Sequence, residues 1–197
     1  MLLNAGAEVD ARDNRGRTPL FGPKSKGVAK LLIAEGADVA ATDSDGNTVL
    51  HGAEGDIVGL LLDAGASAAA QNNTGVAPLH ISASRGGTEI ASVLIAAGAD
   101  VAATDMNGDT ALHRAAHKGH MALCQMLLDA GADVQVENTN GETAEDRAHV
   151  FVCGVSRKMK REVQPPEQLA SLFSRVFFLC WGSSRLSVHL CRVLKDW

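Results

Sequence analysis

The chain has 197 residues, of which 46% are hydrophobic, so it can bury a core and is not disordered along its whole length. Its net charge of −5 is uneven: residues 1–149 hold 10 Lys+Arg against 20 Asp+Glu, and residues 150–197 hold 8 against 3. The first part lacks the basic surface of a nucleic-acid-binding domain, and no stretch reaches the ~18 apolar residues of a membrane-spanning helix.

The predicted elements form repeated units, which two series of glycines mark. The first series is Gly6, Gly36, Gly65, Gly98 and Gly131, and the second is Gly16, Gly46, Gly75, Gly108 and Gly141. Both series have spacings of 30, 29, 33 and 33 residues, which indicates an internal repeat. In chain order we expect a partial unit at 1–12, shortened units at 13–42 and 43–71, full units at 72–104 and 105–137, and a capping half-unit at 138–150.

Each unit is predicted to contain a turn and two short helices. A turn such as Asn107-Gly108 precedes a Thr-x-Leu motif, whose Thr suits a helix N-cap. The second helix carries apolar residues at offsets i, i+3 and i+4, and the glycine after it suits a left-handed helix end. These apolar sets are Val28, Leu31 and Leu32; Ile57, Leu60 and Leu61; Ile90, Val93 and Leu94; and Leu123, Met126 and Leu127. Units this small must stack to bury a shared core.

The motifs resemble the ankyrin-repeat signature, which contains Thr-Pro-Leu-His-x-Ala and Gly-Ala-Asp. The closest copies are Thr110-Ala111-Leu112-His113-Arg114-Ala115, Ala77-Pro78-Leu79-His80, Gly98-Ala99-Asp100 and Gly131-Ala132-Asp133. The resemblance covers about residues 2–148. It implies an all-α solenoid of stacked helix–turn–helix units with short β-turn fingers. It also implies that His51, His80 and His113 make structural hydrogen bonds to neighbouring loops.

The units at 13–42 and 43–71 are three and four residues short, and the loss lies between the Thr-x-Leu motif and the second helix. This loss is about one helical turn, so the second helix keeps nearly the same face. We expect both units to stack, with a shortened or irregular first helix. Gly22-Pro23 supports this expectation, because proline disfavours helix geometry in the residue before it.

The two ends of the repeat differ. The chain starts inside a unit, which indicates a fragment of a longer array or an incomplete gene model, and Met1–Gly6 does not look like a secretory signal. At the other end, Glu145 and Asp146 replace the Leu-His of earlier units, which suits a polar cap. The four cysteines lack metal-site spacing, so we expect reduced thiols and an intracellular protein, either cytoplasmic or nuclear.

Residues 151–197 depart from the repeat and form a basic, aromatic tail, expected to be poorly ordered or a docked helix. The tail holds the basic cluster 157–161 and an apolar stretch at 169–181. Leu186–Arg192 faintly resembles the start of a SOCS box, although Ser187 stands where that motif needs leucine. This tail suggests an alternative function, an adaptor that recruits a ubiquitin-ligase or signalling complex. The start inside a unit permits another, a regulatory fragment of a larger enzyme.

No phosphate loop, catalytic constellation or metal-ligand set is apparent, so we expect no enzyme activity, cofactor or metal. The resemblance implies a scaffold or adaptor that binds another protein through its turn tips and first helices, as a monomer. The matching tip positions are Asp43, Asp45, Asn47, Asn73, Val76, Met106 and Asp109. The helix positions, expected to be exposed, are Ser84, Arg85, Arg114, His117 and Lys118. Met106 and Arg114 are the foremost candidates, and the acidic array favours a neutral or basic partner whose binding weakens with salt.

Overall fold

The computed structural model describes residues 6–22 and 25–152, with side chains up to Ala148. In this part the elements are η2 (Pro19–Phe21, a 3-10 helix), α1 (Lys26–Ala34), α2 (Val49–Gly52), α3 (Asp56–Asp63), α4 (Pro78–Arg85), α5 (Thr88–Ala96), α6 (Ala111–Lys118), α7 (Met121–Asp129) and α8 (Ala144–Val152). The fold is the all-α solenoid that the sequence predicts, and the described residues contain no strand. None of the helices in these ranges has the length and apolarity to cross a membrane.

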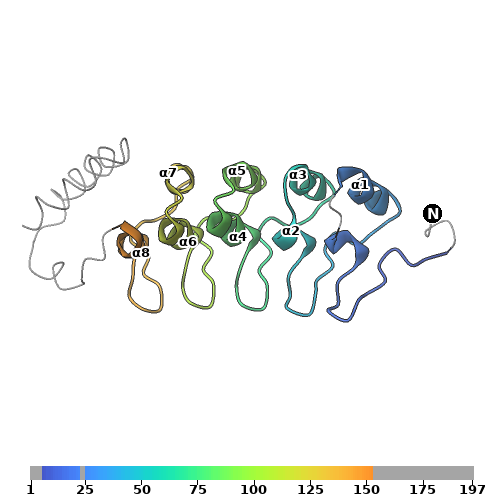
Figure 1. Cartoon of the computed structure of the whole chain (residues 1–197), viewed down its shortest axis with the longest axis horizontal. Helices are drawn as coiled ribbons and strands as arrows, with labels where there is room; N and C mark the ends of the chain where they lie inside the picture. The colour runs from blue at the N-terminus through green and yellow to red at the C-terminus, as the bar shows by residue number, and fades with distance from the viewer. Residues whose placement is uncertain (1–5, 23–24, 153–197) are drawn as a thin grey trace, which may run out of the picture. The chain divides into compact units, whose positions relative to one another are not determined.

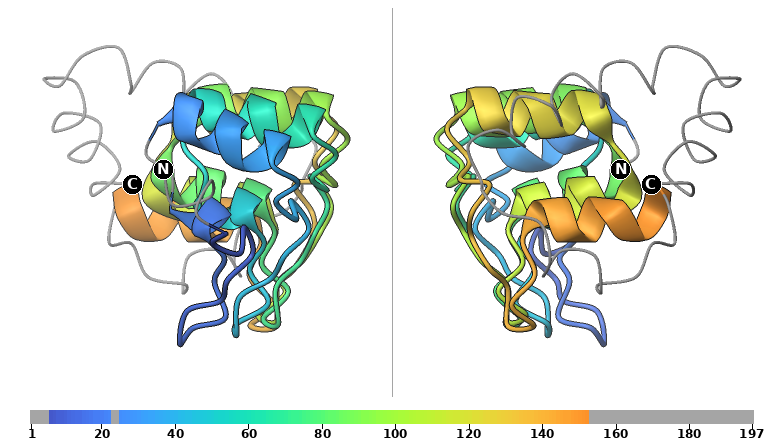
Figure 2. Two further views of the ribbon diagram at one scale, coloured as in Figure 1. Left: turned by 90° about the vertical axis from the view of Figure 1, so that its right-hand side faces the viewer. Right: turned by 90° about the vertical axis from the view of Figure 1, so that its left-hand side faces the viewer.

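The helices of residues 6–152 lie in two layers (Figures 1 and 2). The first helices η2, α2, α4, α6 and α8 form one layer, and the second helices α1, α3, α5 and α7 form the other. Successive helices pack against each other from η2 to α6 in the first layer and from α1 to α7 in the second, and each of α2, α4 and α6 also packs against the second helix of its own unit. The loops before the first helices project on one side as a row of fingers, which Figure 2 shows end-on.

Glycines end the second helices as the sequence predicts. After α5, the backbone N–H of Gly98 donates to Ile95 O at 3.0 Å and that of Ala99 donates to Leu94 O at 2.9 Å. This hydrogen-bond pair requires a left-handed residue, and Gly98 has φ +85°. The same pair recurs at Gly36, Gly65 and Gly131, so the four units present their next loops in the same direction.

The core runs through the units between the two layers. Leu61, Leu94 and Leu127 are at most 1% exposed, which confirms the shared interior that the sequence predicts. Three residues before each of these leucines, a smaller side chain is buried: Val58, Ala91 and Cys124. Burial raises the pKa of the Cys124 thiol to about 11, so this cysteine is an inert, reduced core residue.

The predicted apolar sets are wrong in part. Val28, Leu31 and Val93 are 50%, 39% and 36% exposed, whereas Ala29 and Ala91 are fully buried. One residue turns a helix by about 100°, so the positions next to the core-facing ones point outward. Since the second helices pack side by side, small alanines face the packed layer and larger side chains take the open face.

The two shortened units have reduced first helices, as predicted. Their first helices are the three-residue η2 and the four-residue α2, whereas α4 and α6 each have eight residues. The second helices keep their length, with nine residues in α1 and eight in α3. The missing turn is therefore taken from the first-helix layer alone, and the second-helix layer continues through these units.

Candidate partner-binding surface

The fingers are held rigid by the side chain at their first position. In the finger at 43–47, Asp43 Oδ1 accepts the backbone N–H groups of Asp45 at 3.0 Å and Asn47 at 2.8 Å. Asp43 Oδ2 accepts the Asn47 side-chain amide at 3.1 Å, and Asn47 Oδ1 accepts from Asn72 at 2.7 Å. Asp43 and Asn47 are thus half-buried supports of the finger, and Asp45 is the exposed candidate at its tip.

Neighbouring fingers are joined through their backbones. Asn73 N donates to Asp45 O and Met106 N donates to Thr74 O, both at 3.0 Å. The fingers approach so closely that a Cβ at Gly108 would lie 2.9 Å from the backbone N of Thr139. Asn73 is exposed and also donates its side-chain amide to Ser44 O at 3.3 Å. The tips therefore form one continuous edge rather than separate loops.

Three equivalent histidines tie the first helices α2, α4 and α6 to the finger of the next unit. His51 Nε2 lies 2.8 Å from Val76 O, His80 Nε2 lies 3.0 Å from Asp109 O, and His113 Nε2 lies 3.0 Å from Glu142 O. Their structural role is confirmed, and half-buried Val76 serves it through its carbonyl group.

His51 and His80 are held in their neutral form. The backbone N–H of Ala77 donates to His80 Nδ1 at 3.1 Å, so Nε2 carries the proton and donates to the carbonyl of Asp109. Burial lowers the pKa of His51 and of His80, which favours the neutral ring at physiological pH.

Arg114 is not the exposed residue that the sequence predicted. Its Nη2 lies 2.5 Å from Oδ2 of Asp105, and the two side chains are 23% and 2% exposed. Burial alone would raise the pKa of the Asp105 carboxyl, but hydrogen bonds from Arg114 and from the backbone N–H groups of Asn107 and Asp109 outweigh it and lower that pKa. Arg114 therefore stabilises the finger that displays Met106, and only part of its guanidinium faces solvent.

Asp109 was predicted to be an exposed tip residue, and this prediction is wrong. Its side chain is 7% exposed, 3.1 Å from Nη2 of Arg147, and its Oδ1 accepts the Asn138 amide at 2.8 Å. The turn geometry explains the error, because the residue after the finger glycine returns toward the helices. Asp109 joins the last full unit to the capping half-unit.

The remaining candidates gather on the first helices. Arg85 and Lys118 are exposed, whereas Ser84 and His117 are half-buried, against the expectation of full exposure for these two. A groove is lined by Ser84, Asp109, Arg114, His117, Lys118 and Arg147, from α4, the finger before α6, α6 and α8. Met106 stands at the finger tip of the same unit and is 70% exposed. Asp43, Asp45, Asn47, Asn73 and Val76 belong to other fingers and do not line this groove.

Arg147 was missed at the sequence level, although a signal was available. It lies 33 residues after Arg114, the length of a full unit, and Asn138 likewise lies 33 residues after Asp105. The pair Asp105–Arg114 and the cap residues Asn138 and Arg147 thus occupy equivalent positions. If the repeat period is applied to charged residues as well as to glycines, it indicates that Arg147 belongs to the same surface as Arg114.

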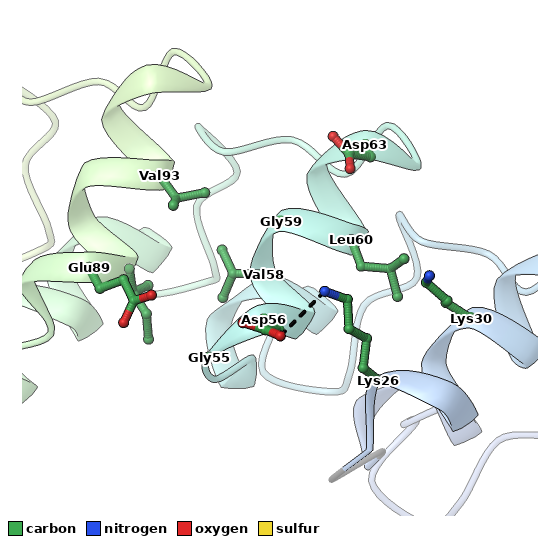
Figure 3. Close-up of a pocket in the computed structure, with 11 residues that line it drawn as sticks. Lys26, Lys30, Gly55, Asp56, Val58, Gly59, Leu60, Asp63, Glu89 and Val93 are labelled. Atoms are coloured by element: carbon green, nitrogen blue, oxygen red, sulfur yellow. Dashed lines mark hydrogen bonds and ion pairs between the residues drawn. The ribbon is translucent and has the colours of Figure 1, made fainter.

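A second groove lies on the second-helix face (Figure 3). Lys26 and Lys30 of α1 border it, Gly55, Gly59 and Leu60 come from α3 and the loop before it, and Ile90 and Val93 come from α5. Lys26 Nζ lies 3.3 Å from Oδ2 of Asp56 across the groove. Asp63 and Glu89 also line it, so lysines and carboxylates are nearly balanced and charge does not select one class of ligand. Sequence reasoning missed this groove as well.

The comparison with known families agrees with this architecture. Residues 52–138 match the family model described as ankyrin repeats (3 copies). These matched residues form ankyrin repeats, and such repeats generally mediate protein–protein interaction. No curated protein matches the chain.

Several predictions fall on residues 153–197, which lie outside the described residues. These are the basic cluster, the apolar stretch and the segment that resembles a SOCS box. In the residues that the structure does describe, no group of three or more His, Cys, Asp or Glu side chains is arranged to hold a metal ion.

Proposed function

We propose that this protein recognises another protein through the finger tips and first helices of residues 72–148, as a scaffold or adaptor. The observation that carries the proposal is Met106, a 70% exposed methionine on a finger whose neighbouring side chain, Asp105, is buried. An apolar, adaptable side chain held outward on a rigid support is typical of an anchor residue in an interface.

The supports around Met106 strengthen this proposal. Its backbone N–H is bonded to Thr74 O at 3.0 Å, and the N–H groups of Asn107 and Asp109 are bonded to Asp105 Oδ1 at 2.8 and 3.0 Å. A finger fixed in this way loses little conformational entropy when a partner binds, so more of the contact energy appears as affinity. The first helices beside it add polar groups that suit the rim of an interface.

The test compares two exposed apolar residues, one on a finger and one on the second-helix layer. Met106→Ser removes the proposed anchor, and Leu128→Ser changes a 40% exposed leucine on α7 that lies outside the proposed surface. Proteins captured by the full chain from a cell extract should be reduced about tenfold or more by Met106→Ser, as for an anchor worth about 1.4 kcal/mol or more, and retained by Leu128→Ser. Equal capture by both variants, or loss with Leu128→Ser alone, would contradict the proposal.

Arg114→Ala is a poor test of binding, because it leaves the buried Asp105 carboxylate without its cationic partner. A lost interaction could then reflect a displaced finger rather than a lost contact. Lys118 is the better polar probe, since it is exposed and has no ion pair within the described residues.

A further inference from the structure

The groove lined by Ser84, Asp109, Arg114, His117, Lys118 and Arg147, here called the basic groove, differs in charge from the array that contains it. Residues 1–149 hold twice as many acidic as basic residues, yet three of the six groove residues are Arg or Lys, one is His and one is acidic. Arg85, at the end of α4, adds a further exposed cation on the same helix as Ser84.

Two carboxylates near the basic groove are set beneath its surface, whereas that of Glu142 is 20% exposed and lies 3.6 Å from Nη1 of Arg147. Asp105 and Asp109 are 2% and 7% exposed, and their oxygens are already occupied by Arg114, Arg147, Asn138 and backbone N–H groups. They orient the two guanidinium groups, each of which keeps about a fifth of its side chain exposed. An Arg held in this way still offers N–H donors, which match the planar geometry of a carboxylate.

The cations at the edge of the groove are not neutralised. Lys118 has no ion pair in the described part of the chain, and Arg85 pairs only with Glu54, at 3.6 Å between two exposed side chains. Such an exposed pair contributes little and exchanges readily for another anion. Charges beyond about 8 Å are largely screened at physiological salt, so these local cations outweigh the negative charge of distant units.

We propose that the basic groove binds an acidic peptide segment of the partner, with Asp or Glu carboxylates between Lys118 and the guanidinium groups of Arg114 and Arg147. This inference rests on the proposed function and specifies its partner. It replaces the neutral or basic partner expected from net charge, because binding responds to the potential at the contact rather than to the total charge. Met106 then supplies an apolar contact beside the charged one.

The experiment is selection of random 12-residue peptides, displayed on phage, against the immobilised full chain. The wild-type protein, Lys118→Glu, Met106→Ser and Lys30→Glu are used in parallel. Lys30→Glu is the matched control, since it makes the same charge change at an exposed lysine of α1, on the other helix layer. Circular dichroism of each variant confirms that the exposed substitutions leave the fold intact.

We expect peptides enriched on the wild type and on Lys30→Glu to be rich in Asp and Glu, and to be lost on Lys118→Glu. An enriched peptide made synthetically should bind Lys118→Glu about tenfold or more weakly than wild type, since a reversed charge at such a contact costs on the order of 1.4 kcal/mol. The same peptide with Gln in place of Glu should bind comparably weakly, and added salt should weaken the wild-type complex.

Two other outcomes separate this inference from the proposed function. Apolar or basic peptides that depend on Met106 would overturn the acidic-segment inference and leave the binding surface in place. No enrichment on the wild type, or enrichment that none of Met106→Ser, Lys118→Glu and Lys30→Glu reduces, would overturn both.

Discussion

The shortened units at 13–71 and the full units at 72–137 share their second helices but differ in their first helices. The short units keep the buried leucines Leu32 and Leu61, and their fingers are bonded to each other and to the next finger. Their first helices fall to three and four residues, against eight in the full units. The comparison shows that stacking needs the second-helix core and the fingers, and tolerates the loss of a first-helix turn.

The same comparison locates the functional surface. The residue nine positions after the first finger residue is Gly22 or Gly52 in the short units and Arg114 in the unit at 105–137. The short units therefore lack the side chain that forms a buried ion pair and lines the basic groove. Their shortened first helices carry less surface for a partner, which concentrates the candidate surface on residues 72–148.

The largest expected effect comes from truncating equivalent core leucines in the two kinds of unit. Leu94→Ala should lower the free energy of unfolding by about 2–5 kcal/mol, because Leu94 is 1% exposed and packed in a full unit. Leu32→Ala should cost less, since Leu32 is 7% exposed and its neighbour is the short helix η2. Urea unfolding followed by circular dichroism measures both. Equal losses would show that the short units are packed as tightly as the full ones.

A smaller effect is expected from the buried ion pair between Arg114 and Asp105, which has no counterpart in the described residues of the short units. Arg114→Ala should destabilise the protein by about 1–3 kcal/mol, because it leaves a buried carboxylate unpaired. Arg85→Ala, which removes an exposed pair at 3.6 Å, should change stability by less than about 0.5 kcal/mol. The same unfolding assay applies. A negligible effect of Arg114→Ala would mean that the pair does not support the finger.

The histidine bridges predict a pH dependence smaller than either truncation. The pKa of His51 and of His80 is lowered by burial in the folded state, so the unfolded chain takes up protons first as pH falls below about 6.5. The free energy of unfolding should therefore be at its maximum above about pH 7 and should decrease as the pH falls from 7 to 5. The double variant His51→Gln/His80→Gln should flatten this slope. An unchanged slope would assign the dependence to other groups.

The smallest expected effect is a gain of stability in the first short unit. Thr18 Oγ1 is buried without a partner among the described residues, because Phe21 stands where later units have the histidine that bonds this hydroxyl. Phe21→His should supply that partner and slow hydrogen exchange in residues 13–42. The corresponding rise in the free energy of local opening should be less than about 1 kcal/mol. Phe21→Leu is the control that stays apolar. Slower exchange in Phe21→Leu than in Phe21→His would contradict the prediction.

Much of the fold could be predicted because its determinants are local and repeat. A glycine such as Gly98 is needed for a left-handed helix end, and its recurrence reveals the unit length. The missing turn in the short units was visible as a change of spacing. The exposure of Val28 and Leu31 was not visible, because periodicity separates faces of a helix but does not say which face meets a neighbour.

The sequence by itself determined the repeat, the order of the units and the helix ends, since each depends on residues within one unit or at a fixed spacing, and the family resemblance implied the structural role of the histidines. Only the tertiary structure decided the candidate site. It buried Asp109, paired Arg114 with Asp105, and brought Arg147 of the cap beside Lys118 of the preceding unit. Burial and ion pairing depend on how neighbouring units pack, and this packing sets whether a charged side chain supports the scaffold or faces a partner.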